Sequence, residues 1–156
     1  MRTSEMSETH GATSRAVRTE SVLRHELFIY ALEGLAEYRD LMIEIGSHVD
    51  AGDIQAVTSE LTLAECLAKP FADGRAAWAE VYEQALQDSP SLRVAPVTRE
   101  VLIAAAGLRG AHRIGLADAI HLATAIAEEC TVFLTNDSRL AAVSQLQVIL
   151  LPQLQP

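Results

Sequence analysis

Three acidic side chains stand in mostly apolar stretches of the chain and could hold a metal ion: Glu65, Asp118 and Asp137. Asp118 lies near the start of a helix, expected over 116–129, that is apolar on almost every side and so belongs inside a domain. Three close carboxylates cannot all stay ionised in a half-buried pocket without a cation, and oxygen ligands select hard ions such as Mg²⁺ or Mn²⁺. Such ions activate water and stabilise charge on a phosphoryl oxygen.

Each of these acids also has a purely structural explanation. Asp137, together with Asn136, is a good N-cap for a short helix. Asp118 gains from the helix dipole in the first turn of its helix. Glu65 can pair with Lys69 one turn further along the chain. The residues alone therefore leave open whether these acids bind a metal or only cap helices and pair on the surface.

The segments around the acids alternate between strand and helix. Strands are expected close to Val22-Leu23 and over 54–57, 92–97, 131–134 and 148–151, and helices over 26–34, 36–50, 60–69, 75–88, 99–113 and 116–129. This alternation predicts an α/β fold, a single three-layer α/β/α domain with a central parallel sheet. Open α/β sheets carry their sites beyond the C-terminal ends of the strands, so the three acids can converge at one edge.

Local signals set the expected ends of several helices. The Thr58-Ser59 pair and Thr98 are expected to supply N-caps, because their hydroxyls can accept the first free backbone N–H groups of a helix. Pro70 is expected to end the helix over 60–69. Gly115 separates the last two long helices.

The composition describes one globular domain. A chain of 156 residues with 49% apolar side chains can bury a single sizeable core. Residues 1–20 lack the apolar stretch of a secretory signal, so we expect a disordered tail there and a domain over 22–151. No window approaches the length that spans a membrane.

Cys66 and Cys130 lie among apolar neighbours without a CxxC spacing, which favours buried reduced thiols and a cytoplasmic protein.

The charge argues against broad electrostatic binding to nucleic acid, because the net charge is −9. A local basic strip is still present in Arg93, Arg99, Arg109 and Arg113. Arg109 and Arg113 are four residues apart and share a helix face. This strip is either a solvated helix surface or a place for phosphate groups.

Three segments together resemble the PIN domain family, and within it the VapC-type toxins of bacterial toxin–antitoxin pairs. They read Thr-Ser-Glu-Leu-Thr-Leu-Ala-Glu over 58–65, Gly-Leu-Ala-Asp-Ala-Ile-His-Leu-Ala-Thr-Ala over 115–125 and Leu-Thr-Asn-Asp over 134–137. The 28–34 segment also looks like the first helix of the family. The resemblance covers about residues 22–151. It implies an α/β/α domain that acts as a Mg²⁺-dependent endoribonuclease, is held by an antitoxin that fills its groove, and is usually a homodimer.

By matching position, the resemblance makes Glu65, Asp118 and Asp137 the catalytic, metal-binding acids, with Mg²⁺ or Mn²⁺ as the ion. By the same match, His121, Thr135 and Asn136 are expected to surround these acids without binding the metal. Three basic residues just before the buried helix, Arg109, His112 and Arg113, are then candidates to hold RNA phosphates or an antitoxin carboxylate.

The chain departs from the family after its first strand, where the family has an Asp-Thr-Asn-like triplet with a metal-binding Asp. The matching positions here hold Arg24, His25 and Glu26. If the Arg24 guanidinium enters the pocket, it competes with the metal for the same carboxylates, because it cannot deprotonate. Glu26 is a candidate to replace the lost acid in part.

A change in the gene is an alternative explanation of this departure. Codons for Arg-His-Glu, read one base later, can spell Asp-Thr-Asn. Loss or misreading of one base just before Leu27 would place residues 1–26 in the wrong frame.

Two rival functions stay open at this stage. One is a catalytically impaired PIN-like domain that binds an antitoxin or another partner without cleaving RNA. The other is a plain α/β scaffold whose acids only cap helices.

Overall fold

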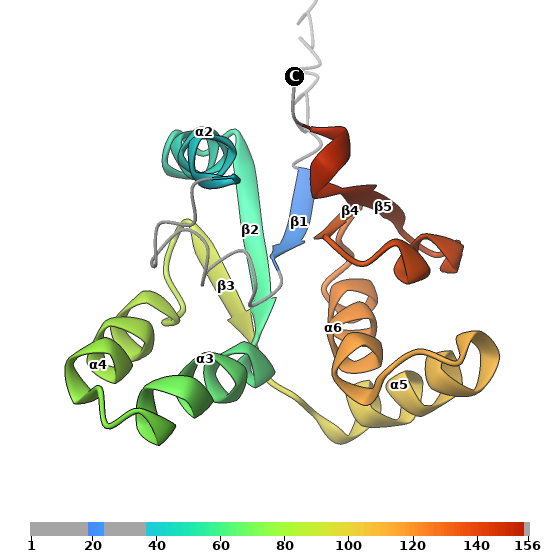
Figure 1. The fold of residues 1–156 in the computed structure, drawn as a ribbon. Coiled ribbons are helices and arrows are strands. Elements are labelled where there is room, and N and C mark those ends of the chain that lie inside the picture. Colours follow the sequence, from blue (N-terminus) through green and yellow to red (C-terminus); the bar gives the residue numbers. More distant parts are fainter. Residues whose placement is uncertain (1–18, 24–36, 155–156) are drawn as a thin grey trace, which may run out of the picture.

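The computed structural model describes residues 19–23 and 37–154, and it contains a five-stranded parallel sheet (Figure 1). The strands are β1 (Thr19–Leu23), β2 (Ile54–Ser59), β3 (Leu92–Ala95), β4 (Val132–Thr135) and β5 (Gln147–Leu150), in the spatial order β3-β2-β1-β4-β5. Val22 of β1 is in register with Val57 on one side and Phe133 on the other. The central strand is therefore the first one in the sequence.

Helices connect these strands, as the alternation in the sequence predicts. They are α2 (Arg39–Asp50), α3 (Glu60–Ala72), α4 (Ala76–Ala85), α5 (Arg99–His112) and α6 (Leu116–Ala127), with the short 3₁₀ helices η1 (Ser138–Ala142) and η2 (Leu151–Gln153) near the end. The α/β fold with a parallel sheet is confirmed. None of the helices in the described ranges is long and apolar enough to cross a membrane.

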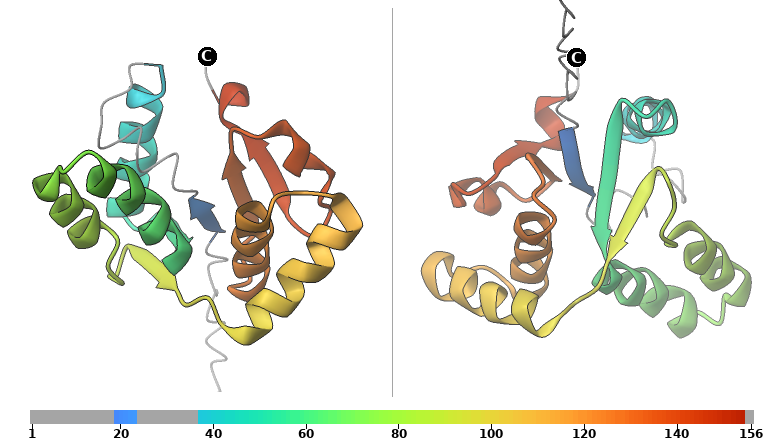
Figure 2. Two further views of the ribbon diagram at one scale, coloured as in Figure 1. Left: turned by 60° about the horizontal axis from the view of Figure 1, so that its bottom comes forward. Right: turned by 180° about the vertical axis from the view of Figure 1, so that it is seen from behind.

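Adjacent residues of one strand point to opposite faces of the sheet, and both faces are buried. Ala56 belongs to a core shared with Met42 of α2, whereas its neighbour Val57 belongs to the core formed with α5 and α6. In β4, Phe133 and Leu134 divide between the same two cores. Helices thus cover the sheet from two sides, as Figure 2 shows for α2 on one side and α6 on the other.

The α6 helix is buried over a continuous run from Asp118 to Ala125, which confirms the expectation of an internal helix. It packs against α5 and against β1 and β2. Its polar members Asp118, His121 and Thr124 are buried among apolar residues. Thr124 donates its hydroxyl to the Ile120 carbonyl, 2.8 Å away, so its burial is satisfied within the helix.

The helix caps form as expected. The Ser59 hydroxyl accepts from the Leu61 N–H at 3.2 Å, and the Thr98 hydroxyl accepts from the Val101 N–H at 3.3 Å. Both thiols, Cys66 and Cys130, are free and buried.

Two expectations on segment ends are wrong. The α3 helix continues through Pro70 to Ala72. A proline in the last turn removes only one helical N–H bond, and the Pro70 carbonyl still accepts from the Arg75 N–H at 2.8 Å. The sheet also begins at Thr19, inside the expected tail, because Thr19 and Glu20 pair with β2. The helix expected over 26–34 lies outside the described residues, as do Arg24, His25 and Glu26.

Candidate functional site

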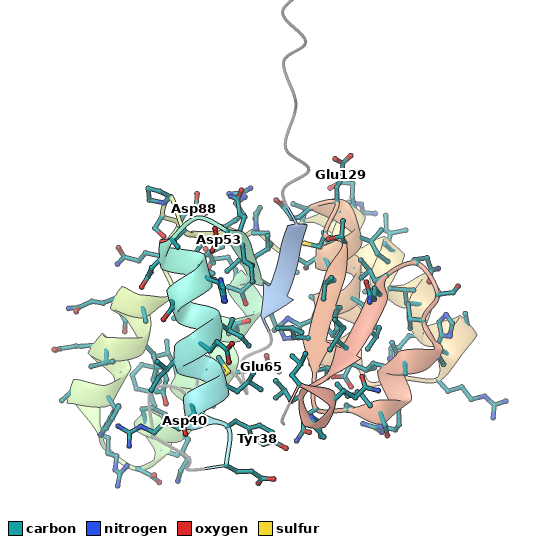
Figure 3. The ribbon with its side chains drawn as sticks, turned by 90° about the horizontal axis from the view of Figure 1, so that it is seen from above. Tyr38, Asp40, Asp53, Glu65, Asp88 and Glu129 are labelled. Atoms are coloured by element: carbon teal, nitrogen blue, oxygen red, sulfur yellow. The ribbon has the colours of Figure 1, made fainter. Side chains whose placement is uncertain are left out.

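The candidate acids lie on elements that border the edge of the sheet where the parallel strands end. Asp137 is two residues past β4, Glu65 lies in α3 after β2, and Asp118 lies in the first turn of α6, which runs back along the sheet. Figure 3 shows the two ends of the sheet: Asp53, Asp88 and Glu129 lie where strands begin, whereas Glu65 lies toward the end to which the β1 arrow points. Open α/β sheets place their binding sites at this edge.

Within the described residues, Asp118 and Asp137 both lie against one cation, the guanidinium of Arg139. One Nη nitrogen of Arg139 lies 2.5 Å from the Asp137 Oδ2 and 4.0 Å from the Asp118 Oδ2. The Asp118 side chain is only 12% exposed, so its carboxylate faces this cation while it is largely shielded from solvent. Two of the three predicted acids are thus brought together in space, although they are 19 residues apart along the chain.

Asp137 is held from several directions and also has the structural role considered above. Its Oδ1 accepts from the Arg139 backbone N–H at 2.9 Å and so caps η1. The Arg139 Nε donates to both Asp137 oxygens at 3.0 Å. The Asp137 N–H donates to the Thr135 hydroxyl at 3.0 Å. The cap explanation is therefore correct for Asp137, but it accounts for only part of what its carboxylate contacts.

Glu65 is tied to α6 by His121 and not to Lys69. The Glu65 Oε2 and the His121 Nε2 are 2.7 Å apart, which joins α3 to α6 across 56 residues of sequence. His121 is fully buried, and it lies one turn after Asp118 on α6. Lys69 pairs instead with Asp73 at 2.7 Å, and this pair lowers the pKa of the Asp73 carboxyl.

The remaining predicted site residues lie around this edge in different settings. Thr135 is fully buried at the end of β4 and holds Asp137, whereas Asn136 is exposed. Arg109 and Arg113 are exposed and line an open groove with Ala106, Gly110, Ile114 and Leu116. His112 is half-buried in the last turn of α5.

The basic strip is broken at Arg93. Its Nε donates to the Glu128 carboxylate at 3.2 Å, and its Nη1 lies 3.4 Å from the Asp88 Oδ2. Hydrogen bonding and charge from Glu128 raise the pKa of Arg93 above its ordinary value. This arginine therefore neutralises local acids where the strands begin and is not part of the candidate site.

Arg139 is the residue of this site that the sequence patterns did not indicate. The hydrogen bonds and charge of Asp137 raise the pKa of Arg139. The signal was available in the Asp-Ser-Arg spacing over 137–139, because the first turn of a helix brings a residue two positions later back toward its N-cap. A search for acids alone passes over it.

A divalent cation fits the acid pair in its chemistry. Mg²⁺ is commonly bound through one or two carboxylates and retained water, and two carboxylates already surround one positive group here. Within residues 19–23 and 37–154, no three His, Cys, Asp or Glu side chains converge closely enough to form a complete ligand set. The described part of the site is thus a two-carboxylate arrangement, with Glu65 held nearby on α3.

Structures of known proteins share this fold. The chain is similar to VapBC2 from Rickettsia felis bound to a promoter DNA fragment, with 16% identity, a TM-score of 0.67, and coverage of 85% of this chain and 98% of the other. It is similar to FitAcB from Neisseria gonorrhoeae at 17% identity and a TM-score of 0.65, covering 86% and 99%. A toxin–antitoxin complex from Klebsiella pneumoniae gives 17% identity, a TM-score of 0.62, and coverage of 84% and 95%.

Sequence comparison gives a second, independent finding. No protein of curated function matches the chain in sequence. The model of the PIN domain matches residues 26–146, which include all three acids and Arg139. PIN domains are generally nucleases that act on phosphodiesters with divalent metal ions. Since this match spans most of the chain, and the fold agrees with it, the protein is a member of the PIN domain family.

Proposed function

We propose that this protein is a Mg²⁺- or Mn²⁺-dependent endoribonuclease of the VapC toxin type. The observation that supports it best is the convergence of Asp118 and Asp137 on one cation at the C-terminal edge of the sheet. Two carboxylates that converge on a positive group at this edge are suited to a hard divalent ion. The membership of the PIN domain family supports a nuclease.

Asp118 and Asp137 would hold the ion, and Glu65 would add a third carboxylate. Mg²⁺, when bound, activates water for attack and stabilises charge on a phosphoryl oxygen. His121 fixes the Glu65 carboxylate through the 2.7 Å contact, and Thr135 fixes the backbone of Asp137. Without a cation, the acids would repel the phosphate of an RNA substrate.

The partners in this proposal are RNA, an antitoxin and a second copy of the chain. Arg109, His112 and Arg113 lie beside the start of α6 and are suited to phosphate or carboxylate groups. The similar structure from Klebsiella pneumoniae is a toxin–antitoxin complex, which supports an antitoxin as partner. A cytoplasmic location agrees with the two free cysteines.

The alternative is a PIN domain that binds its partner without cleaving RNA. It is favoured by Arg24, which directly follows β1 in the sequence, where the family has an acid. The frameshift hypothesis would explain this arginine, and sequencing the gene across the codons for 24–27 tests it. Codons that cannot spell Asp-Thr-Asn in the neighbouring frame would end that idea.

A titration of the purified protein with Mg²⁺ or Mn²⁺ tests the proposed function, with cleavage of RNA and metal binding both measured. We expect Asp118→Asn to abolish cleavage and to weaken metal binding. Asp53→Asn is the matched control, because Asp53 lies at the opposite end of the sheet (Figure 3). Antitoxin binding without cleavage at any metal concentration would favour the alternative.

The variant Arg24→Asp separates an impaired enzyme from an active one. If the guanidinium weakens the site, the acid should raise the cleavage rate and the metal affinity. An unchanged rate would contradict this explanation of Arg24.

A further inference from the structure

We propose that Arg139 is a built-in counter-ion of the acid pair, and that a divalent cation must displace its guanidinium to enter the site. This inference rests on the proposed function of Asp118 and Asp137 as metal ligands. It assigns to Arg139 a control over metal binding that is separate from the chemistry of cleavage.

The contacts of Arg139 place its positive charge where a metal would have to lie. Its Nε and one Nη nitrogen contact the Asp137 carboxylate, and the same Nη nitrogen faces the Asp118 Oδ2 at 4.0 Å. Mg²⁺ needs carboxylate oxygens at about 2.0–2.1 Å. A guanidinium that already contacts both Asp137 oxygens therefore competes directly with the ion for these lone pairs.

The environment of Arg139 allows the side chain to leave without unfolding the site. The side chain is 73% exposed, so it can move into water. The next residue, Leu140, is fully buried and anchors η1 to the core. The Asp137 Oδ1 also accepts the backbone N–H of Arg139, and this bond does not depend on the arginine side chain. Displacement thus requires rotation of one side chain while the backbone stays in place.

The displaced charge would still oppose the metal from nearby. At a separation of about 6 Å, the repulsion between a guanidinium and a divalent cation lowers the affinity of the site for that cation roughly tenfold, even with the screening of water. Arg139 would therefore raise the metal concentration that is needed to fill the site. In the absence of metal, the same arginine would offset the repulsion between the two carboxylates.

The test is to measure Mn²⁺ binding to the full chain by calorimetry, together with thermal unfolding with and without Mn²⁺. The variant Arg139→Gln keeps a similar size without the charge, and Arg75→Gln removes an exposed arginine from the distant turn between α3 and α4. We expect Arg139→Gln to bind Mn²⁺ about tenfold more tightly. We also expect its unfolding temperature to fall without metal and to rise more than that of the unchanged protein when Mn²⁺ is added.

The outcomes separate this inference from the proposed function. Equal Mn²⁺ affinity of Arg139→Gln and the unchanged protein would overturn the counter-ion role, while loss of binding in Asp118→Asn would still support the metal site. A gain of affinity that Arg75→Gln reproduces would show a general charge effect and would also overturn the inference. If neither the unchanged protein nor Arg139→Gln binds Mn²⁺, the counter-ion role and the metal site both fail.

Discussion

The His121 Nε2 and the Glu65 Oε2 lie 2.7 Å apart and connect α6 to α3 in the interior of the protein. His121 has no exposed side-chain area, whereas the Glu65 side chain is 21% exposed. A buried donor thus holds one end of a carboxylate that reaches toward solvent. The contact fixes the position of Glu65 relative to Asp118, which is three residues before His121 on the same helix.

Replacing His121 by Leu should destabilise the protein. The substitution leaves the Glu65 carboxylate without this partner in a largely buried place, and such losses cost about 1–3 kcal/mol. Unfolding in urea measures the difference. His48→Leu is a matched control, because His48 also contacts an acid, Asp53 at 3.1 Å, but both side chains are more than half exposed. A similar loss in both variants would contradict the special role of the buried contact.

Replacing Gly115 by Ala should disturb the Asp118 carboxylate without disturbing the backbone. The added Cβ would lie 3.2 Å from the Asp118 Oδ2, while the φ of Gly115 is −63°, which alanine adopts easily. We expect weaker Mn²⁺ binding at nearly unchanged stability. Gly107→Ala is the control, since no atom lies within 4 Å of its added Cβ. An unaltered Mn²⁺ affinity in Gly115→Ala would argue against Asp118 as a ligand.

Replacing Glu129 by Gly should stabilise the protein by about 1 kcal/mol, because this residue has a φ of 56°, in the left-handed region that side chains disfavour. Glu129 is exposed beyond the end of α6 (Figure 3). Thermal or urea unfolding measures the gain. Glu129→Ala separates backbone conformation from charge, and an equal gain in that variant would show that charge is the cause.

The start of α5 should lose stability in acid. The backbone N–H of Glu100 and the Thr98 hydroxyl hold the pKa of the Glu100 carboxyl below its ordinary value of 4.5. A carboxyl with a lowered pKa stabilises the folded state above that ordinary value, and this contribution disappears as the pH falls through the lowered pKa. Glu100→Gln should therefore show a shallower loss of stability between about pH 5 and pH 2. An identical pH profile in the two proteins would contradict this assignment.

The sequence was sufficient for the architecture because each element carries a local signal. An apolar stretch of helical length marks α6, and hydroxyl caps at Ser59 and Thr98 mark the starts of α3 and α5. The strands are short and apolar, as buried parallel strands are. The predicted end of α3 at Pro70 is too early, because the presence of a proline does not reveal whether the last turn of a helix can tolerate the loss of one backbone hydrogen bond.

The site was predictable only in part, since its contacts are between residues distant in sequence. The acids were identified by their unusual apolar surroundings and by the family pattern. Glu65 and His121 are 56 positions apart, and only the folded chain brings them into contact. Arg139 was missed because a pattern of ligands does not reveal the positive group that balances them. Charge balance is a property of the assembled pocket and not of any one segment.

The central place of β1 makes the integrity of the whole sheet depend on five residues near the N-terminus. In the described part of the chain, β1 pairs with β2 on one side and with β4 on the other. A shortened protein that starts after Leu23 would retain two separate ribbons, β3 with β2 and β4 with β5. Glu65, which follows the first ribbon, and Asp137, which follows the second, would then be related only through helix contacts such as that of His121 with Glu65, and no longer through a continuous sheet.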